Sequence, residues 1–291
     1  MPQTINTNLA SLNAQRNLST SQSSLAVSMQ RLSSGLRVNS AKDDAAGLAI
    51  AERMQSQVRG MNVAIRNAND GISMAQTAEG AMGKVADSLQ RMRELAVQSA
   101  NDTNSVSDKD SLDLEFGELA KEIQRVLGGT TFNSKSILSA DPGVAGVDYS
   151  FQIGANTSGH DTITITTPNL TEDTDILAVA GPADGSTRAS IDGNQTSDGI
   201  RLVMDAIDKA IDKINSQRAV MGASQSRFES VIGNLQISVE NQSAARSRIM
   251  DTDFAAETAN LSRAQILQQA GNAMVAQANA LPQQVLKLLQ G

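Results

Sequence analysis

The chain offers few side chains that could do chemistry. It contains no cysteine, and His160 is its one histidine. Without cysteine there is no thiolate nucleophile, no thiolate metal ligand and no disulfide. A single imidazole also argues against a multi-histidine metal centre or a serine–histidine triad. We therefore expect no catalytic residue, no bound metal and no cofactor, and an enzyme is the remotest of the functions that we weigh.

Two acidic segments are the remaining candidates for acid–base or metal chemistry. Asp43 and Asp44 could act as paired carboxylates in acid–base catalysis. His160 and Asp161 could together form a general base or a metal site. However, residues 40–43 fit a helix capping box, where both aspartates would suit the positive end of a helix. His160 lies in a predicted turn with no second histidine. A structural role is the better interpretation of both segments.

The prolines divide the chain into two blocks that permit long helices. They stand at positions 2, 142, 168, 182 and 282, so residues 3–141 and 183–281 contain none. Both blocks carry apolar residues in alternating steps of four and three, as in the run from Met54 to Ala96. This 3.5-residue period is typical of coiled coils. It predicts helices at 41–101, 107–128 and 200–249, the second opened by a capping box at 107–110 and ended by Gly128-Gly129.

The residues between these blocks have a different pattern. Residues 141–200 are rich in Gly, Thr and Asp, which predicts a non-helical segment. Alternating apolar residues at 147–153 and 163–165, joined by a loop with Asn and Gly, predict a β-hairpin. A lone hairpin is marginally stable, so we expect it to lie on the helices. The predicted fold class is mainly α, with long coiled-coil helices from both termini and a small β-hairpin.

Charge is unevenly distributed. The net charge is −7, which argues against nucleic-acid binding, and no apolar run reaches the roughly 20 residues that span a membrane. Residues 1–37 carry three arginines and no acid, and residues 254–291 carry Glu257, Arg263 and Lys287. These ends are either flexible polar tails or segments buried against other protein, and the apolar heptad of residues 267–288 favours burial.

The energetics of the ends point the same way. Ordering about 40 residues costs about 1–2 kcal/mol each in backbone entropy, and a narrow row of seam residues does not offset that cost. We therefore expect both ends to be disordered in the monomer and to fold on assembly.

Four segments resemble bacterial flagellin closely. They are QRLSSGLRVNSAKDDAAGLAIA at 30–51, LQRMRELAVQSAN at 89–101, ARSRI at 245–249 and SRAQILQQAG at 262–271. The resemblance implies a D0 terminal coiled coil from residues 1–40 and 250–291. It also implies a D1 helical bundle with a β-hairpin from 41–165 and 200–249, and a short variable outer loop at 166–199. We therefore expect a short form without further outer domains.

The resemblance also implies a function and partners. A flagellin is a structural subunit that self-assembles into the extracellular flagellar filament for swimming motility. The first residues lack the basic and apolar stretches of a cleaved signal peptide, so we expect export through the flagellar type III apparatus. Implied partners are hook-associated and cap proteins and an export chaperone at residues near 255–291. The alternative is a hook–filament junction protein with the same terminal design.

Three residue sets follow from the resemblance. The surface read by the vertebrate Toll-like receptor TLR5 would comprise Gln90, Arg91, Leu95 and Glu115, although Arg91 and Glu94 could also pair locally. The epitope of the plant flagellin receptor would comprise Gln30, Arg31, Leu32, Asn39, Ser40, Lys42, Asp43 and Asp44. The predicted self-assembly residues are Leu18, Leu25, Met29, Leu32, Leu267, Met274, Leu281, Val285 and Leu288.

Overall fold

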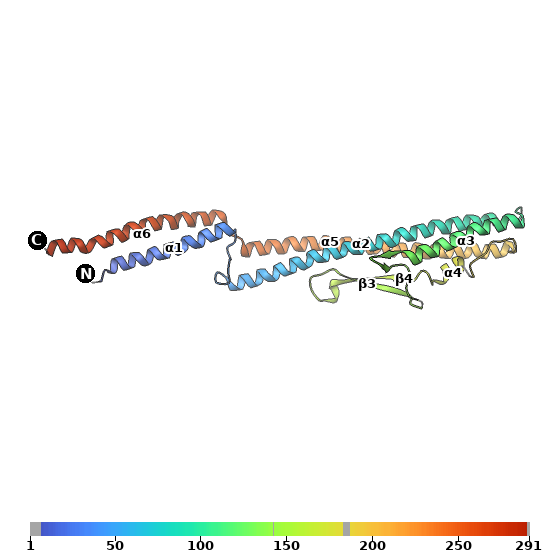
Figure 1. Ribbon diagram of the computed structural model, residues 1–291, viewed down its shortest axis with the longest axis horizontal. Helices are drawn as coiled ribbons and strands as arrows, with labels where there is room; N and C mark the ends of the chain where they lie inside the picture. The colour runs from blue at the N-terminus through green and yellow to red at the C-terminus, as the bar shows by residue number, and fades with distance from the viewer. Residues whose placement is uncertain (1–6, 142, 183–186, 290–291) are drawn as a thin grey trace. The chain divides into compact units, whose positions relative to one another are not determined.

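The chain is mainly helical, as predicted, in a computed structural model that describes residues 7–141, 143–182 and 187–289, with side chains through Ala280 (Figure 1). In these residues no helix is long and apolar enough to cross a membrane. The helices are α1 (Leu9–Ser34), α2 (Ala45–Ser99), α3 (Val106–Gly129), α4 (Thr174–Ala180), α5 (Ser197–Met250) and α6 (Phe254–Leu289), with a 3-10 turn η1 (Gly159–Asp161). The strands are β1 (Thr131–Phe132), β2 (Lys135–Ser136), β3 (Gly146–Gln152) and β4 (Thr162–Pro168).

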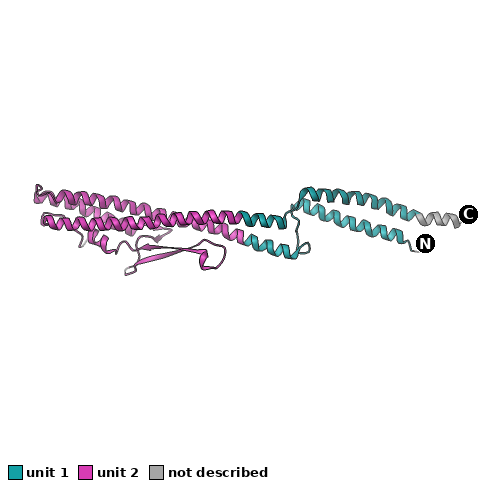
Figure 2. Ribbon diagram, turned by 180° about the vertical axis from the view of Figure 1, so that it is seen from behind, with its two compact units in different colours: residues 1–56, 240–291 teal, residues 57–239 magenta. Residues whose placement is uncertain are grey.

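The chain divides into two compact units (Figure 2). Unit 1 comprises residues 1–56 and 240–291, and unit 2 comprises residues 57–239. Helices α2 and α5 contribute residues to both units, whereas α1 and α6 belong to unit 1. The division into D0 and D1 domains near residues 40 and 250 stays a prediction.

Unit 2 has a core of large apolar side chains from α2, α3 and α5. The predicted four–three stepping along α2 is confirmed by burial of Ala68, Ala75, Met82, Leu89 and Ala96, while Arg93 faces solvent as a polar exception. Other fully buried side chains are Phe116, Ile123, Leu127, Ile207, Ile214, Met221 and Phe228.

The predicted hairpin forms, with β3 antiparallel to β4 and Tyr149 opposite Ile165. It lies on the helices, as expected: the ring of Phe151 meets Phe228 of α5 edge to face, with 5.6 Å between ring centroids. A second, shorter hairpin of β1 and β2 was not predicted. Its turn residues, Asn133 and Ser134, both have positive φ angles, as a two-residue turn requires, and two-residue strands leave too little alternation to detect.

The prediction that residues 141–200 are non-helical is wrong for the seven residues of α4 and for residues 197–200, which begin α5. Asp173 caps α4 by accepting a hydrogen bond from Asp175 N–H, and Ile176, Val179 and Ala180 then fall on one buried face. Burial on unit 2 stabilises a helix that is too short to stand alone. Two described residues on either side of α4 are also packed, since Leu170 and Ile191 are fully buried.

A half-buried ion pair fastens this segment to α3. The Arg188 guanidinium donates two hydrogen bonds to Asp113, of 3.0 Å and 2.6 Å, and Ile191 N–H donates to the same carboxylate. Burial raises the pKa of Asp113, but the hydrogen bonds from Arg188, Ile191 and Ser190 outweigh it, so the net pKa is lowered. The described residues of this segment, 166–182 and 187–199, are thus held on unit 2, and the placement of the predicted loop 166–199 outside a filament stays a prediction.

Both predicted capping boxes are displaced. Helix α2 begins at Ala45 because Asp44, not Ser40, caps it, with Asp44 Oδ1 accepting a hydrogen bond of 2.8 Å from Gly47 N–H. The box of α3 joins Ser105 and Asp108, two residues before the predicted one. In each case several Ser and Asp residues compete for one cap, and composition alone does not select the winner.

Candidate assembly surface

Helix α1 has caps at both ends. The Asn8 side chain accepts a hydrogen bond from Ser11 N–H at the first turn. At the other end Gly35 adopts a left-handed conformation, with φ of 71°, and its N–H bonds to Arg31 C=O. The chain then pairs with the short link between α5 and α6 through a bridge between Leu36 and Asp251. Thus α1 and α6 are brought side by side within unit 1 (Figure 1).

The two helices meet along a heptad contact face, which we call the seam. On α1 it comprises residues 11, 14, 18, 21, 25, 28 and 32, and on α6 residues 257, 261, 264, 268, 271, 275 and 278, all buried or half-buried. Ser28 meets Glu257, whereas Ser11 meets Asn279, so the helices run antiparallel. The seam is built largely from small or polar side chains, which allow Cα atoms of the two helices to approach within 8 Å.

Gly271 shows how close the approach is. A Cβ atom added there would lie 3.2 Å from Leu18 Cδ1, tighter than ordinary van der Waals contact. A larger side chain at position 271 would therefore push Leu18 or the whole of α1 away.

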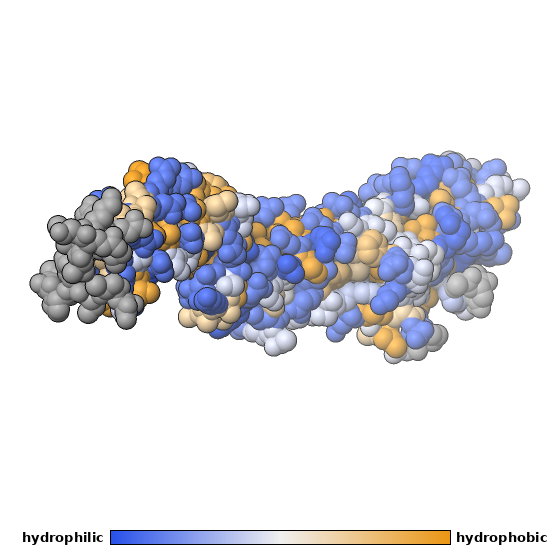
Figure 3. All heavy atoms as spheres, turned by 60° about the vertical axis from the view of Figure 1, so that its left-hand side comes forward, coloured by the Kyte–Doolittle hydropathy of each residue, from blue (hydrophilic) through white to orange (hydrophobic). Residues whose placement is uncertain are grey.

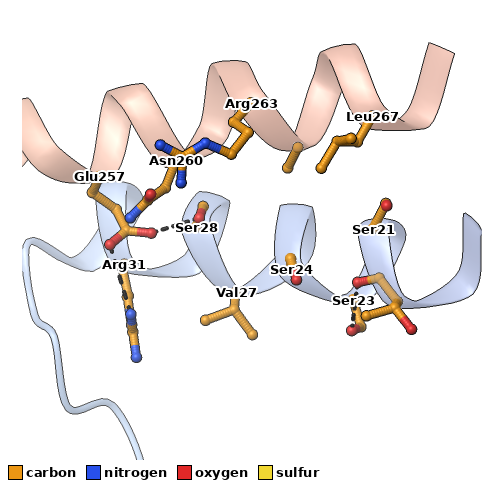
Figure 4. Close-up of a pocket in the computed structure, with 12 residues that line it drawn as sticks. Ser21, Ser23, Ser24, Val27, Ser28, Arg31, Glu257, Asn260, Arg263 and Leu267 are labelled. Carbon is orange, nitrogen blue, oxygen red and sulfur yellow. Dashed lines mark hydrogen bonds and ion pairs between the residues drawn. The ribbon is translucent and has the colours of Figure 1, made fainter. Parts of the chain in front are cut away.

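A buried carboxylate lies in the seam near the start of α6. Glu257 is 7% exposed, and its Oε1 accepts a hydrogen bond of 2.5 Å from Ser28 Oγ. Arg31 Nη1 lies 3.6 Å from Glu257 Oε2. Figure 4 shows this cluster at one end of a groove that Ser24, Val27, Arg263 and Leu267 also line. Because a buried charge is costly without its partners, the cluster favours one register of α1 against α6.

A second polar contact compensates for a proline inside α6. Pro282 has no N–H, so the Ala278 carbonyl four residues earlier lacks its helical donor. The Asn8 side-chain amide donates to that carbonyl at 2.7 Å. Hence the residue that caps α1 also satisfies the gap in α6.

The α1–α6 pair leaves large apolar side chains on its outside, where orange atoms are prominent beside the grey terminal residues in Figure 3. Exposed fractions of 50% or more are common among them, reaching 70% for Leu9. The exposed set, which we call the outer apolar surface, is Leu9, Leu12, Val27 and Met29 on α1, and Phe254, Ile266, Leu267 and Met274 on α6. A helix that is apolar on several faces is typical of one that more protein covers.

The predicted assembly residues divide between these two surfaces. Leu18, Leu25 and Leu32 lie in the seam. Met29, Leu267 and Met274 were expected in the contact between the helices, but they are exposed and belong to the outer apolar surface. The seam uses the neighbouring positions 28, 264, 268, 271 and 275 instead. The side chains of Leu281, Val285 and Leu288 lie outside those that the structure describes.

The predicted plant-receptor residues form the end of α1 and the loop before α2. Gln30 and Lys42 are exposed, whereas Arg31 and Leu32 are half-buried. The Asp43 carboxylate gathers the loop by accepting hydrogen bonds from Asn39 N–H and from the Ser40 N–H and hydroxyl, and the bonds from Ser40 lower its pKa. Together with Asp44 as the cap of α2, these contacts support the structural interpretation of the aspartates. His160 is exposed in η1, in the loop between β3 and β4.

The predicted Toll-like receptor residues lie on unit 2. Arg91 of α2 donates hydrogen bonds of 2.9 Å to Glu115 of α3 and 2.9 Å to Glu94, and the Glu115 bond contributes most to its raised pKa. Gln90 is also exposed. Leu95 departs from the expectation: its side chain is 0% exposed and packs in the core, so a partner could not touch it in this conformation. The local Arg91–Glu94 pair is confirmed, whereas its link to Glu115 across two helices was not predicted.

Comparison with known proteins decides the family. A model of the bacterial flagellin N-terminal helical region matches residues 5–141, and one of the C-terminal helical region matches residues 204–289. The chain belongs to the bacterial flagellin family. Two relatives, the flagellins of Halalkalibacterium halodurans and Bacillus subtilis, are 43% and 41% identical to it, each over 98% of this chain and 99% of the relative.

Family membership bears on two further questions, whether the chain is an enzyme and whether it is a hook–filament junction protein. Flagellins are structural proteins of the flagellar filament, which confirms that the chain is not an enzyme. A solved structure described as a flagellar hook-associated protein from Vibrio parahaemolyticus matches 72% of this chain and 100% of its own, with a TM-score of 0.60 and 11% identity. At that identity the likeness shows a shared fold, and it does not favour the junction alternative.

Proposed function

We propose that this flagellin chain self-assembles into the extracellular flagellar filament through the seam-paired helices α1 and α6. One observation carries the proposal. The α1–α6 pair makes its mutual contact largely through small and polar residues with a few leucines, and it leaves the outer apolar surface uncovered. Covering it would remove apolar area from water at roughly 25 cal/mol per Å², and neighbouring copies of the chain carry the same uncovered helices.

Seeded growth tests this proposal directly. Purified monomer added to filament fragments is expected to grow long filaments, measured by electron microscopy and by sedimentation of polymer. The critical concentration of monomer reports the free energy of assembly. Short oligomers that never elongate, or growth only with added partner proteins, would favour the hook–filament junction alternative.

A matched pair of truncations tests the surface itself. Leu267→Ala removes exposed apolar atoms that assembly would bury, and it is expected to raise the critical concentration at least about tenfold. Gln265→Ala, on the same helix and also exposed, removes a polar side chain and is expected to change it much less. Equal effects of the two changes would show that the outer apolar surface does not drive assembly.

The proposal extends to export and to other partners. We expect secretion through the flagellar type III apparatus, a chaperone at residues near 255–291, and contacts with hook-associated and cap proteins. A chain cut before residue 255 should lose the chaperone in a pull-down of the purified pair. The order of both ends should also depend on assembly, so amides of residues 9–34 should exchange faster in monomer than in filament.

Immune recognition is a separate proposal. The exposed Arg91–Glu115 pair and Gln90 supply the surface for the Toll-like receptor, and residues 30–44 supply the plant-receptor epitope. Arg91→Ala should lower receptor signalling by purified monomer in reporter cells, while Arg125→Ala, in another exposed pair, should not. Equal signalling by both variants would contradict the proposal.

A further inference from the structure

The described methionines of this chain fall into three accessibility groups. The sequence has 11, of which ten lie in the residues that the structure describes. Six of these are at most 6% exposed and two are half-buried. Met29 and Met274 stand apart, with exposed fractions of 58% and 61%. Oxidation of a thioether follows its accessibility, so among the ten described methionines these two sulfurs are the ones that a dissolved oxidant reaches first.

Both methionines lie on the outer apolar surface, on different helices. Met29 follows the seam residue Ser28 on α1, and Met274 lies seven residues beyond Leu267 on α6, on the same face. In the isolated chain both are open to solvent. In an assembly that covers the outer apolar surface, both would be enclosed by apolar neighbours.

We propose that Met29 and Met274 are oxidation sites of the unassembled chain, and that the sulfoxide at either position blocks incorporation into a filament. The inference rests on the proposed assembly function. The oxidant is a peroxide: the thioether sulfur attacks one oxygen of hydrogen peroxide, the O–O bond breaks, an S–O bond forms and water leaves. The sulfur loses two electrons and the peroxide gains them.

The sulfoxide changes what assembly must bury. A flexible apolar side chain becomes a polar one with a strong acceptor oxygen. Enclosed among apolar side chains, that oxygen would lose its hydrogen bonds to water and find no donor to replace them, so burial is disfavoured. The fold itself is spared because the core methionines, such as Met82 and Met92 at 0% exposed, are shielded. Methionine sulfoxide is reducible by its reductases, so the block is reversible.

The test compares peroxide treatment of full-length monomer and of finished filaments. Peptide mass spectrometry of the monomer is expected to show sulfoxide first at Met29 and Met274. The treated monomer is then offered to untreated filament seeds, and its critical concentration is expected to rise at least about tenfold. In treated filaments the same two residues should oxidise at least about tenfold more slowly than in monomer.

Two double variants identify the responsible residues. The variant M29L/M274L keeps side-chain volume and cannot form the sulfoxides, so after peroxide it should elongate like untreated protein. The control variant M54L/M204L replaces the half-buried methionines, and after peroxide it should stay blocked.

Each other outcome overturns the inference. It fails if oxidised wild-type chain elongates normally, or if M29L/M274L is blocked as strongly as wild type by peroxide. If that variant does not elongate even untreated, the comparison of oxidation rates at Met29 and Met274 between monomer and filament becomes the test. Equal rates in the two states reject the proposal. Failure of untreated wild-type chain to elongate is distinguishable, because it rejects the assembly function instead.

Discussion

The α1–α6 pair and the core of unit 2 use the same heptad spacing but fill it with residues of different size. In unit 2 the heptad positions hold large side chains such as Leu89, Met82 and Phe228, each 0% exposed. In the α1–α6 seam the buried positions include Ser11, Ala264 and Ala278. Spacing therefore decides that helices pair, whereas side-chain size decides whether the pair is stable by itself.

The difference has an energetic meaning. Full burial of a large apolar side chain contributes about 1.5–3 kcal/mol, and alanine or serine contributes much less. Unit 2 has a sufficient core of its own. The α1–α6 pair gains close approach and a defined register from its small and polar residues, but many of its large apolar side chains stay outside. Four substitutions test this contrast.

The largest effect is expected from Phe228→Ala in unit 2. Phe228 is 0% exposed and packs against Phe151, so its loss leaves a cavity that costs about 3–5 kcal/mol of the free energy of unfolding. Urea unfolding measures the loss, and hydrogen exchange should place it in unit 2 and not in α1. Ile237→Ala, at a 61% exposed position of the same helix, should cost under about 0.5 kcal/mol.

The next effect is expected from the ion pair of unit 2. Arg188→Ala removes two hydrogen bonds to the half-buried Asp113 carboxylate and should cost about 2–3 kcal/mol in urea unfolding. The exposed pair of Arg125 and Glu122 is a control, and Arg125→Ala should change the free energy of unfolding far less than Arg188→Ala.

The same pair has a pH signature. The pKa of Asp113 is lowered in the folded state, so its contribution is fully present above the usual value of 3.8 and is lost as the pH falls through the lower folded value. Wild type should therefore lose stability more steeply than Arg188→Ala below about pH 4. Parallel curves for the two proteins would contradict the assignment.

A smaller effect is expected from Ser28→Ala in the seam. The Glu257 carboxylate then loses its 2.5 Å hydrogen bond and retains Arg31 at 3.6 Å, which should cost about 1–2 kcal/mol. Hydrogen exchange should quicken at residues 25–32 and 257–261 and not in unit 2. Ser24→Ala, one turn earlier and exposed, is the control for the change in helix propensity. Faster exchange throughout unit 2 would show that the two regions are not independent.

The smallest effect is expected from Asn8→Ala, at about 1 kcal/mol. Part of this loss is the helix cap, and part is the hydrogen bond to Ala278 C=O, which has no helical donor because residue 282 is proline. In the Pro282→Ala background the second part should vanish, since residue 282 then supplies an N–H. A double-mutant cycle by hydrogen exchange at residues 9–12 measures the coupling, and additive effects would reject the explanation.

The sequence was sufficient for the long helices and the main hairpin. Proline-free blocks with heptad spacing predicted α2, α3 and α5 within a few residues of their observed ends. Helix α4 could not be predicted, because its seven residues are helical through burial on unit 2 and not through their own propensity. The β1–β2 hairpin is too short for its alternation to be recognised.

The candidate surface was harder to predict. Helix α6 carries two heptad rows, one through Leu267 and Met274 and one through Ala264 and Gly271. Hydrophobicity selects the first row as the contact with α1, but the structure uses the second, because close approach requires small side chains. The burial of Leu95 was missed for a related reason, since adjacent residues on one helix can belong to the core and to the surface.

The antiparallel seam also governs the order of folding. Its hydrogen bonds join residues 229 positions apart at Ser28 and Glu257, and 270 apart at Asn8 and Ala278. Closing a flexible loop of that length costs about 5 kcal/mol in chain entropy before any contact is gained. Contacts of such high sequence separation form slowly, after local ones. During synthesis α1 therefore has no α6 to pack against until nearly the whole chain has been made.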